Sequence, residues 1–496
     1  MEDKLVKGAH KVLFINTFAF TICFACWMLN GVLVTFLVDN QVFAWSPSMI
    51  GWLMGIPVLT GAVFRLPLGM LTDKYGGRPV FGLLLLLSAI PMYLLSTVDS
   101  FWGYALCSFG FGITGASFAV GIAFTSYWYP KNRQGVALGI FGAGNAGAAI
   151  TTMFAPTLLN HLTNGGVDVD AWRYLPQIYA AVLVVIGILF MMLVKNKKPE
   201  SSGKNLVEMF QPLKSVRVWR FGLYYALVFG MFVSFSQWLI PYFVNVYYLP
   251  LVTAGVFAAL FSFPSGVIRA LGGWMSDKWG ARKVMYWVLG TSVIFSLMMS
   301  VPKMVIVTPG NGVMSKTNGE VTFVSDSLVS VGTTNYSITQ KPIESTEFIE
   351  NEFHIFPVKT TWQTTVVEVG HVVKKKELLA RGETHILFEA NVWIFAILAI
   401  ILGSIWGIGK AAVYKYIPDY YPNQVGAVGG MVGFIGGLGG FLGPIIFGYL
   451  LEFTGLWTTC WMFMFLFSAI CLVWMQSVVQ KKMKKEVPDL MRTMDG

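Results

Sequence analysis

The chain has 496 residues, of which 55% are hydrophobic and only 12% are charged, and its formal net charge is +10. Soluble domains carry about 25% charged residues, so this composition excludes an ordinary water-soluble protein and predicts an all-α polytopic membrane protein. The lysines and arginines gather in short segments between apolar runs, which argues against a nucleic-acid partner and indicates a lipid bilayer as the surroundings.

Apolar runs of about 20 residues recur along the chain, and each is long enough to cross a hydrocarbon core of about 30 Å. They predict about twelve membrane-spanning helices, at residues 11–37, 46–71, 79–97, 101–128, 134–160, 173–194, 218–245, 251–275, 283–301, 390–415, 423–451 and 456–479. The run lengths define these limits, so the ends are expected to move by several residues.

The charge of the connecting loops alternates along this series. The N-terminus, the even-numbered loops and the C-terminal tail are rich in lysine and arginine, whereas the opposite loops carry Asp39, Asp99, Asp168 and Asp170. Positive charge accumulates on the cytoplasmic side of membrane proteins. Both termini are therefore expected in the cytoplasm, with the chain embedded in a plasma or inner membrane.

Two segments without apolar runs divide the chain into parts. Residues 195–216 contain KNKKPESSGK, which is typical of a flexible linker, and they separate six spans at 1–194 from six at 217–301 and 390–496. Residues 302–389, between the ninth and tenth spans, are polar and hold short alternating runs such as VTFVSDSLVSV. They predict an extracytoplasmic insertion, either β-rich or a partly ordered loop. We favour a tolerated or stabilising insertion over one that binds a partner or gates access.

One pattern occurs twice, as GAVFRLPLGMLTDKYGGR and SGVIRALGGWMSDKWGAR. The copies share an interior arginine, a midway glycine, an aspartate eight residues after the first arginine, and a closing arginine: Arg65, Gly69, Asp73 and Arg78, then Arg269, Gly273, Asp277 and Arg282. A charge at bilayer depth costs at least ~2.5 kcal/mol, so two at equivalent positions predict a binding site between two halves. Both charges are positive and the spans offer almost no carboxylate partner, so the expected ligand is an anion.

The repeat resembles the loop motif of the major facilitator superfamily. Two further stretches resemble the glycine-rich signatures of the nitrate/nitrite porter family: FGITGASFAVGIAFTSYWYPKNRQGVALGIFGAGNAGAA at 111–149 and YYPNQVGAVGGMVGFIGGLGGFLGP at 420–444. The resemblance covers the chain apart from residues 302–389. It implies the major facilitator fold, with two six-helix bundles that alternate access to a central site, and nitrate and nitrite as substrates.

The same resemblance implies the residues of the site. Arg65 and Arg269 are similar to the family's substrate-binding arginines, and their planar forks of N–H donors suit a flat anion with three equivalent oxygens. The other matches are an amide, a hydrogen-bonding tyrosine and three rings that enclose the anion: Asn145, Tyr225, Phe24, Phe118 and Phe229. From the residues alone, a hydrogen bond to a neighbouring helix explains Asn145 equally well, and ordinary packing explains each phenylalanine.

Glycines line two of the predicted spans, with Gly135, Gly139, Gly142 and Gly147 in the fifth and nine glycines between 426 and 443 in the eleventh. Small residues at these spacings let helices pack closely, at a cost in helix stability. We interpret the two faces as surfaces that slide or rock during transport, with static close packing as the alternative. The glycines and aspartates of the repeat are likewise expected to allow close approach and to cap or pair at the helix ends.

Lys410 bears on how transport is driven. Aspartate and glutamate are missing from the span interiors, which favours exchange of nitrate for nitrite. Lys410 is the interior group that can gain and lose a proton, unless it extends to the membrane surface. Its GKAAVYK stretch resembles the family branch associated with proton symport. We therefore place nitrate/proton symport, with protons as a further partner, ahead of nitrate/nitrite antiport.

Two other functions stay open: a transporter of another small anion or organic acid, and a nitrate sensor that signals through the insertion. The sequence lacks an evident nucleophile–base set, metal-ligand cluster or phosphate-binding loop, so we expect neither an enzyme nor a bound metal or cofactor. The protein is expected to be a monomer.

Overall fold

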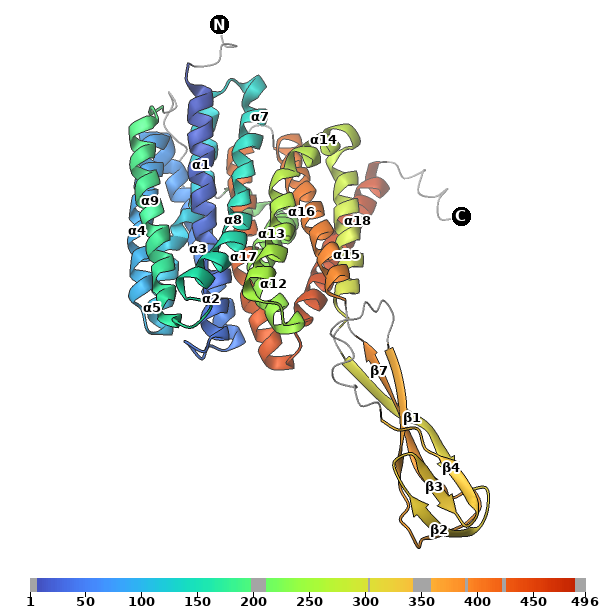
Figure 1. The fold of residues 1–496 in the computed structure, drawn as a ribbon. Helices are drawn as coiled ribbons and strands as arrows, with labels where there is room; N and C mark the ends of the chain where they lie inside the picture. Colours follow the sequence, from blue (N-terminus) through green and yellow to red (C-terminus); the bar gives the residue numbers. More distant parts are fainter. Residues whose placement is uncertain are drawn as a thin grey trace. The chain divides into compact units, whose positions relative to one another are not determined.

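The computed structural model describes residues 7–197, 211–301, 304–341, 358–388, 391–421 and 425–486. The chain divides into two compact units, one of residues 1–300 and 396–496 and the other of residues 301–395. The first unit is helical and the second is made of strands (Figure 1). Most of the predicted linker, at 198–210, lies outside the described residues, as do 302–303, 342–357 and 389–390 of the predicted insertion.

Helices account for almost all of the first unit. Its N-terminal half contains α1 (Ala9–Trp27), α2 (Asn30–Asp39), α3 (Pro47–Tyr75), α4 (Gly77–Leu94), α5 (Phe101–Phe111), α6 (Ser117–Trp128), α7 (Lys131–Gly142), α8 (Gly147–Leu162) and α9 (Tyr174–Leu193). Its C-terminal half contains α11 (Val216–Tyr225), α12 (Phe232–Tyr247), α13 (Leu251–Val267), α14 (Arg269–Trp279), α15 (Ala281–Met299), α16 (Val392–Tyr420), α17 (Val425–Thr454) and α18 (Thr459–Glu486).

The expected polytopic helical architecture is confirmed. Among the described residues, ten helical stretches are long and apolar enough to cross a membrane, and up to eleven if the bent pair α13–α14 counts as one span. Each lies within a few residues of a predicted span. The remaining prediction, 283–301, corresponds to α15, a 19-residue helix whose first turn carries Arg282 and Lys283. These two cations lower its hydropathy, which explains why α15 is not among the apolar stretches.

Several spans are interrupted near their middle. Short 3₁₀ segments separate α5 from α6 at η2 (Gly112–Ala116) and α7 from α8 at η3 (Ala143–Ala146), and a π-helical turn, η6 (Ala226–Met231), separates α11 from α12. A 45° bend at Ile268 separates α13 from α14. Irregular backbone at membrane depth persists only where protein or a water-filled cavity surrounds it. These interruptions therefore mark the interior of the helical unit.

The repeated motif forms the same local structure twice. α3 and α14 end at Gly76 and Gly280, whose φ angles are 88° and 85°, and the next helix starts directly afterwards. Only glycine adopts such angles readily, which explains why both copies end in Gly-x-Arg. The sequence thus specifies a sharp reversal just before each closing arginine, Arg78 and Arg282.

The two halves pack on each other through α3 with α17, α8 with α13, and α2 with α12. They are tight at the end where α3 and α13 begin, because a Cβ at Gly51 would lie 2.9 Å from the carbonyl carbon of Pro444. A Cβ at Gly255 would lie 2.7 Å from Pro156 Cγ. We call this the tight end; it is the lower end of the helical unit in Figure 1.

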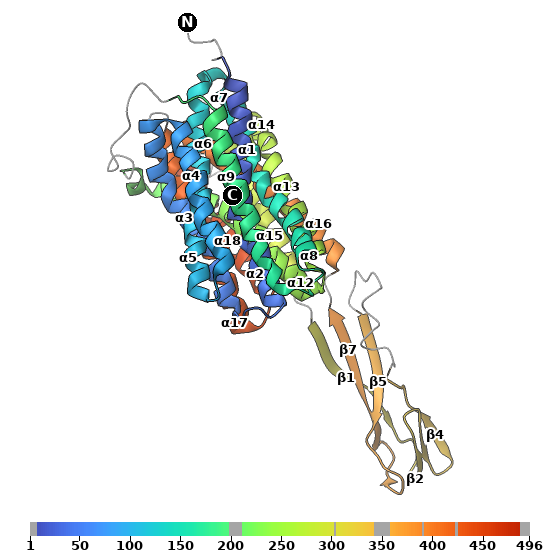
Figure 2. The same cartoon turned by 60° about the vertical axis from the view of Figure 1, so that its left-hand side comes forward.

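The opposite end, which carries α7 and α14, is looser (Figure 1 and Figure 2). A Cβ added to Gly69, Gly135, Gly139 or Gly273 would meet no described atom within 4 Å. We call this the loose end. The close approach expected of these four glycines is therefore not formed in this conformation. Gly147, by contrast, packs against α1, and a Cβ added to Gly437 would lie only 2.6 Å from the Ala62 Cβ.

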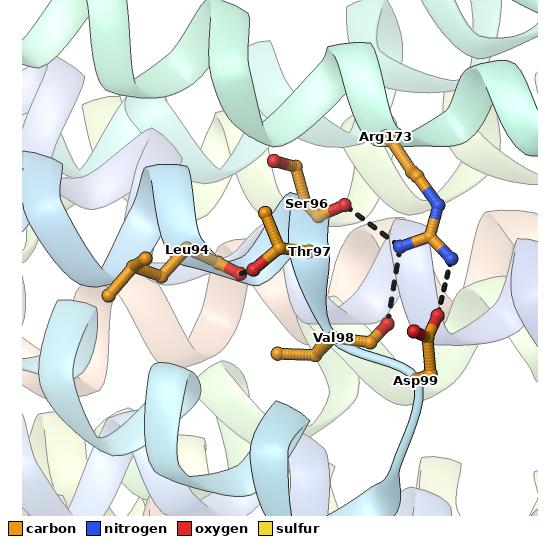
Figure 3. A network of polar contacts seen from close by, with 6 residues as sticks. All are labelled: Leu94, Ser96, Thr97, Val98, Asp99 and Arg173. Carbon is orange, nitrogen blue, oxygen red and sulfur yellow. Dashed lines mark hydrogen bonds and ion pairs between the residues drawn. The ribbon is translucent and has the colours of Figure 1, made fainter.

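Loops at the tight end are held by a polar network around Arg173 (Figure 3). Its Nη1 donates hydrogen bonds to the carbonyl oxygens of Ser96 at 2.8 Å and Val98 at 3.3 Å. Its Nη2 forms an ion pair with Asp99 at 2.5 Å. The network ties η4 (Val169–Arg173), at the start of α9, to η1 (Leu95–Thr97), at the end of α4.

The second unit holds two antiparallel sheets. Its strands are β1 (Met304–Met314), β2 (Gly319–Val324), β3 (Leu328–Val331), β4 (Thr334–Ser337), β5 (Val358–Thr365), β6 (Val372–Val373) and β7 (Leu378–Phe388). One sheet has the order β1-β7-β5 and the other β4-β3-β2-β6. A core that includes Val321, Val329, Val373 and Leu379 is buried within this unit. The predicted β-rich character of the insertion is confirmed.

Candidate functional site

Two arginines from different halves face one aromatic ring. The guanidinium carbon of Arg65, on α3, lies 5.7 Å from the ring centroid of Phe118, and that of Arg269, at the start of α14, lies 5.9 Å from the same centroid. Phe118 is the second residue of α6, directly after the 3₁₀ break η2. The 45° bend before Arg269 and the break before Phe118 thus bring side chains of three helices to one point.

Arg65 is buried, with 7% of its surface exposed, and keeps an unused donor. Its Nη1 donates to the carbonyl oxygen of Gly433 on α17 at 3.0 Å, while its buried Nε has no hydrogen-bond partner. In the described part of the chain, no carboxylate forms an ion pair with Arg65 or Arg269. A buried donor without a partner costs about 1–3 kcal/mol, so an acceptor at this position would be strongly favoured.

The C-terminal half contributes a second aromatic wall. The rings of Tyr225 and Phe229 stack, with centroids 5.0 Å apart and planes at 7°, and Phe229 lies 5.3 Å from the Arg65 guanidinium carbon. The Tyr225 hydroxyl is buried and has no hydrogen-bond partner. Phe229 belongs to the π-helical turn η6, and such turns occur often at functional sites.

Asn145 and Phe24 both belong to the N-terminal half, in η3 and α1. Asn145 sits in the 3₁₀ break η3, is 1% exposed, and its Oδ1 has no hydrogen-bond partner. Phe24 packs edge-on against Phe20 and Trp27, at 5.7 and 5.3 Å, and Phe20 in turn lies 5.6 Å from Phe118. Phe24 therefore supports the ring that both arginines face, and it packs against aromatic residues rather than against a guanidinium group.

A third cation, Lys410 of α16, lies in the interior rather than at a surface. It is fully buried, its Nζ donates to Ser265 Oγ at 2.9 Å, and it stands 3.1 Å from the ring centroid of Phe232. It also lies 6.0 Å from the Phe229 ring and close enough to Arg269 to repel it. The alternative that Lys410 extends to the membrane surface does not describe this structure.

Tyr414 was missed by the sequence interpretation. Its ring lies 5.5 Å from the Arg269 guanidinium carbon and meets Tyr225 edge-on at 4.9 Å. Its hydroxyl donates to the carbonyl oxygen of Gly429 at 3.3 Å. The available signal was spacing, because Tyr414 follows Lys410 by one helical turn and therefore shares its face. Ser265, one turn before Arg269, offered the same signal.

The remaining motif residues lie towards the loose end. Asp73 accepts a hydrogen bond from the Tyr127 hydroxyl, and Asp277 pairs with Lys415 at 2.7 Å. The closing arginines stay within their own halves: Arg78 Nε donates to the Met191 carbonyl oxygen at 2.7 Å, and Arg282 Nη2 to the Tyr420 hydroxyl at 3.4 Å. These contacts anchor helix ends and do not reach the arginine pair.

The assembled site is a cationic, aromatic-walled cluster without a bound counter-charge among the described residues. Its donors converge from both halves of the chain, and its flat rings exclude water, which strengthens hydrogen bonds to a charged acceptor. Such an arrangement suits a small flat anion better than a cation or a bulky polar molecule.

Comparisons with known proteins agree with this description. The family model described as Major Facilitator Superfamily matches residues 15–339 and 380–490. The Probable nitrate/nitrite antiporter NarK1 of Thermus thermophilus is 36% identical over 97% of this chain and 94% of its own length. The Nitrite extrusion protein of Bacillus subtilis is 28% identical over 60% of this chain and 72% of its own.

Solved structures show the same fold at low identity. A bacterial homologue of the human lysosomal transporter Spinster, in an inward-facing and occupied conformation, matches with a TM-score of 0.63 at 13% identity, over 96% of this chain and 98% of that one. The nucleoside transporter NupG matches with a TM-score of 0.58 at 11% identity, over 94% and 98% of the two chains.

Proposed function

Because the chain belongs to the major facilitator superfamily, and within it to the nitrate/nitrite porter family, we propose that it carries nitrate and nitrite across a membrane by alternating access. It is a multi-pass membrane transporter and not an enzyme. The substrate assignment is supported most directly by the two guanidinium groups that face Phe118 from opposite halves of the chain.

Nitrate and nitrite fit the chemistry of the cluster. Both are small, flat monovalent anions whose oxygens accept hydrogen bonds, and guanidinium forks donate to such oxygens in one plane. Arg65 Nε and the Tyr225 hydroxyl are buried groups that an anion would supply with acceptors. The rings of Phe118 and Phe229 would cover the faces of the ion, with Phe24 behind them.

Asn145 is proposed as a further donor to the anion. Its Oδ1 has no partner, so turning the carboxamide by 180° loses no hydrogen bond and presents the NH₂ group at the same position. The place of Asn145 in a 3₁₀ break supports this role, because the break frees its side chain from the regular helix pattern.

The positive charge of the site explains how a bound anion would favour closure of the two halves. Arg65, Arg269 and Lys410 are like charges in a poorly solvated interior, and their repulsion opposes bringing the halves together when the site is empty. An anion neutralises part of this charge and so favours a closed, loaded state. The tight end and the loose end of the present conformation support alternation, because matching glycine surfaces are engaged at only one of them.

For coupling, we propose nitrate/proton symport through Lys410, with nitrate/nitrite antiport as the alternative. Lys410 is fully buried, contacts Ser265 and Phe232, and has no carboxylate partner among the described residues. Its location beside Arg269 supports the idea that anion binding and protonation of the amine influence each other. The proposed placement is a plasma or inner membrane with both termini in the cytoplasm, and the proposed assembly state is a monomer.

Flux in proteoliposomes tests the proposal. The purified protein should take up labelled nitrate, and an imposed nitrite or pH gradient should accelerate that uptake according to the coupling. Arg65→Ala and Arg269→Ala should abolish uptake while the protein still inserts. Uptake that survives either substitution, or equal competition by a carboxylate, would refute the substrate assignment. Binding without any flux would instead identify a sensor.

A further inference from the structure

A second pocket lies apart from the arginine pair, where α14 ends and α15 begins. It has a volume of about 480 Å³ and is lined by Arg282, Lys283, Tyr416, Asp419 and Tyr420, among others. This volume falls within the ~300–1,000 Å³ typical of small-molecule sites. The pocket shares no residue with the proposed nitrate site and plays no part in the mechanism above.

The charge of the pocket favours an anion. Arg282 makes one 3.4 Å contact with the Tyr420 hydroxyl, and Lys283 forms no ion pair within the described part of the chain. Arg217 adds a third cation at the rim, 4.7 Å from the Tyr420 ring centroid. Asp419 is the opposing carboxylate, and it lies close enough to Lys415 to interact with it.

The two copies of the internal repeat differ in how the helix that follows them is capped. At the first copy, Asn196 caps the start of α4: its Oδ1 accepts from the Arg78 backbone N–H at 3.2 Å, and its Nδ2 donates to the Tyr75 carbonyl oxygen at 2.9 Å. At the second copy, the start of α15 has no side-chain cap, and Gly280 and Ala281 line the open pocket. Uncapped N–H groups at a helix start bind anionic oxygens well.

The side chain of Tyr416 points to the same conclusion independently. Tyr416 lines the pocket and is only 7% exposed, and its hydroxyl has no hydrogen-bond partner among the described residues. Its ring is fixed by stacking on Phe221, with centroids 5.0 Å apart and planes at 8°. Because this hydroxyl is free to donate, an acceptor oxygen in the pocket would complete its hydrogen bonding.

The surface beside the pocket identifies the source of the anion. Trp274, Trp279 and Trp287 are all exposed and form a row, with neighbouring ring centroids 5.9 and 6.4 Å apart. Lys278 lies over the Trp274 ring at 5.0 Å. Exposed tryptophans with adjacent basic residues mark the level of lipid headgroups. The pocket therefore opens at the lipid–water boundary rather than into bulk water.

We propose that this pocket binds the phosphate headgroup of an anionic phospholipid from the adjoining leaflet. Arg282 and Lys283 bind the phosphate oxygens, the N–H groups at the start of α15 fill the role that Asn196 plays in the first repeat, and Tyr416 donates from the pocket wall. The acyl chains extend along the tryptophan row. The bound lipid holds α14 to α16 at the end of the helical unit that stays loose between the halves.

Lipid binding to the full-length, delipidated protein in detergent tests this proposal. Short-chain phosphatidylglycerol should raise the thermal unfolding midpoint with saturation, whereas phosphatidylcholine and glycerol 3-phosphate should raise it much less. Lys283→Gln and Arg282→Gln should each weaken the apparent affinity about 10-fold, because each removes a charge-assisted hydrogen bond. Lys283→Arg keeps the positive charge and should retain binding. Asp419→Asn removes the opposing carboxylate and should strengthen binding.

Arg78→Gln is the matched control for Arg282→Gln, because Arg78 holds the equivalent position in the first repeat, where Asn196 already caps the helix. It should leave the affinity unchanged. Native mass spectrometry counts the retained lipid molecules and should show one fewer for Lys283→Gln. Equal effects of phosphatidylcholine, or equal affinity in the pocket variants, would overturn the proposal. Equal stabilisation by glycerol 3-phosphate would assign the pocket to a soluble phosphate and overturn the lipid source.

Discussion

Arg65 Nη1 donates a hydrogen bond to the carbonyl oxygen of Gly433 at 3.0 Å, and this bond joins α3 of the N-terminal half to α17 of the C-terminal half. Its guanidinium group also lies near the rings of Phe118 and Phe229, one from each half. Separation of the halves at this level must therefore change the environment of Arg65. One side chain thus both offers donors to the proposed anion and responds to the movement of the halves.

Arg65→Lys tests whether the fork, and not only the charge, is needed. Lysine keeps the positive charge but cannot reach Gly433 and an anion together in one plane. Loss of a hydrogen bond to a charged group costs about 1.5–3 kcal/mol, so KM for nitrate should rise about 10- to 100-fold. Initial rates of uptake in proteoliposomes over a range of nitrate concentrations measure this change.

Arg173→Lys is the control for that substitution. Arg173 also donates to two carbonyl oxygens and contacts a carboxylate, but it anchors loops at the tight end, away from the site (Figure 3). It should leave KM unchanged. A similar rise in KM for both variants would mean that Arg65 acts through general stability rather than through the anion.

Lys410→Gln should separate the two proposed modes of coupling. The amide can still hydrogen-bond to Ser265 but cannot carry a proton, so a pH gradient should no longer accelerate nitrate uptake. Nitrite-driven exchange should persist, since Arg65 and Arg269 remain. The measurement is the number of protons moved per nitrate, from a pH-sensitive dye inside the liposomes.

Lys415→Gln provides the comparison, because Lys415 lies on the same helix but is paired with Asp277 at 2.7 Å. Whatever its effect on rate, it should keep the proton-to-nitrate ratio of the wild type. An unchanged ratio in Lys410→Gln would remove Lys410 from the coupling mechanism and favour simple exchange.

Apolar run length was sufficient to predict the spans, because each run has to cross the same thickness of hydrocarbon. The limits of α16, predicted at 390–415 and found at Val392–Tyr420, are a typical case. The repeat also indicated two interior arginines. Run length contains no information on breaks within a span, so the 3₁₀ turn at Asn145, the π turn at Phe229 and the bend before Arg269 were not foreseen.

Those breaks determine which side chains lie close together. The residues that form the site could therefore be predicted only in part. Tyr414 and Ser265 were missed because a lone tyrosine or serine on an apolar helix is usually explained by packing. Once Lys410 and Arg269 are known to face inwards, their neighbours one turn away become candidates by helical spacing. The contacts of the Phe24 and Asn145 side chains depend on tertiary packing, which the sequence pattern alone does not predict.

Tyr414→Phe should weaken transport moderately. The substitution keeps the ring 5.5 Å from the Arg269 guanidinium carbon but removes the hydroxyl that donates to Gly429. Loss of one neutral hydrogen bond costs about 1 kcal/mol, so KM should rise about 5-fold with little change in maximal rate. Tyr414→Ala also removes the cation–π contact and should have the larger effect. Equal KM values for wild type and Tyr414→Ala would show that the ring does not position Arg269.

Replacement of residues 304–388 by a short Gly-Ser segment should leave nitrate uptake near the wild-type rate. The strand unit has its own buried core, including Val329 and Leu379, and contributes no residue to the proposed anion site. Its removal should therefore change the stability of the helical unit little. Uptake assays, together with the amount of protein in the membrane, test this expectation. Loss of uptake at normal membrane levels would instead assign the insertion a direct part in transport.

Gly139→Leu should arrest the transport cycle without disturbing the present conformation. A Cβ at Gly139 meets no described atom within 4 Å, and leucine favours a helix by up to about 1 kcal/mol over glycine, so folding should be preserved. Alternation, however, requires the loose end to close, and a leucine on that surface would then collide with the opposite half. Nitrate should still shift the unfolding midpoint, while exchange across the membrane should fall steeply.

Gly290→Leu is the control, because Gly290 is equally uncrowded but lies on α15, which packs against α18. Full exchange activity in Gly139→Leu would exclude closure of the halves along this glycine surface.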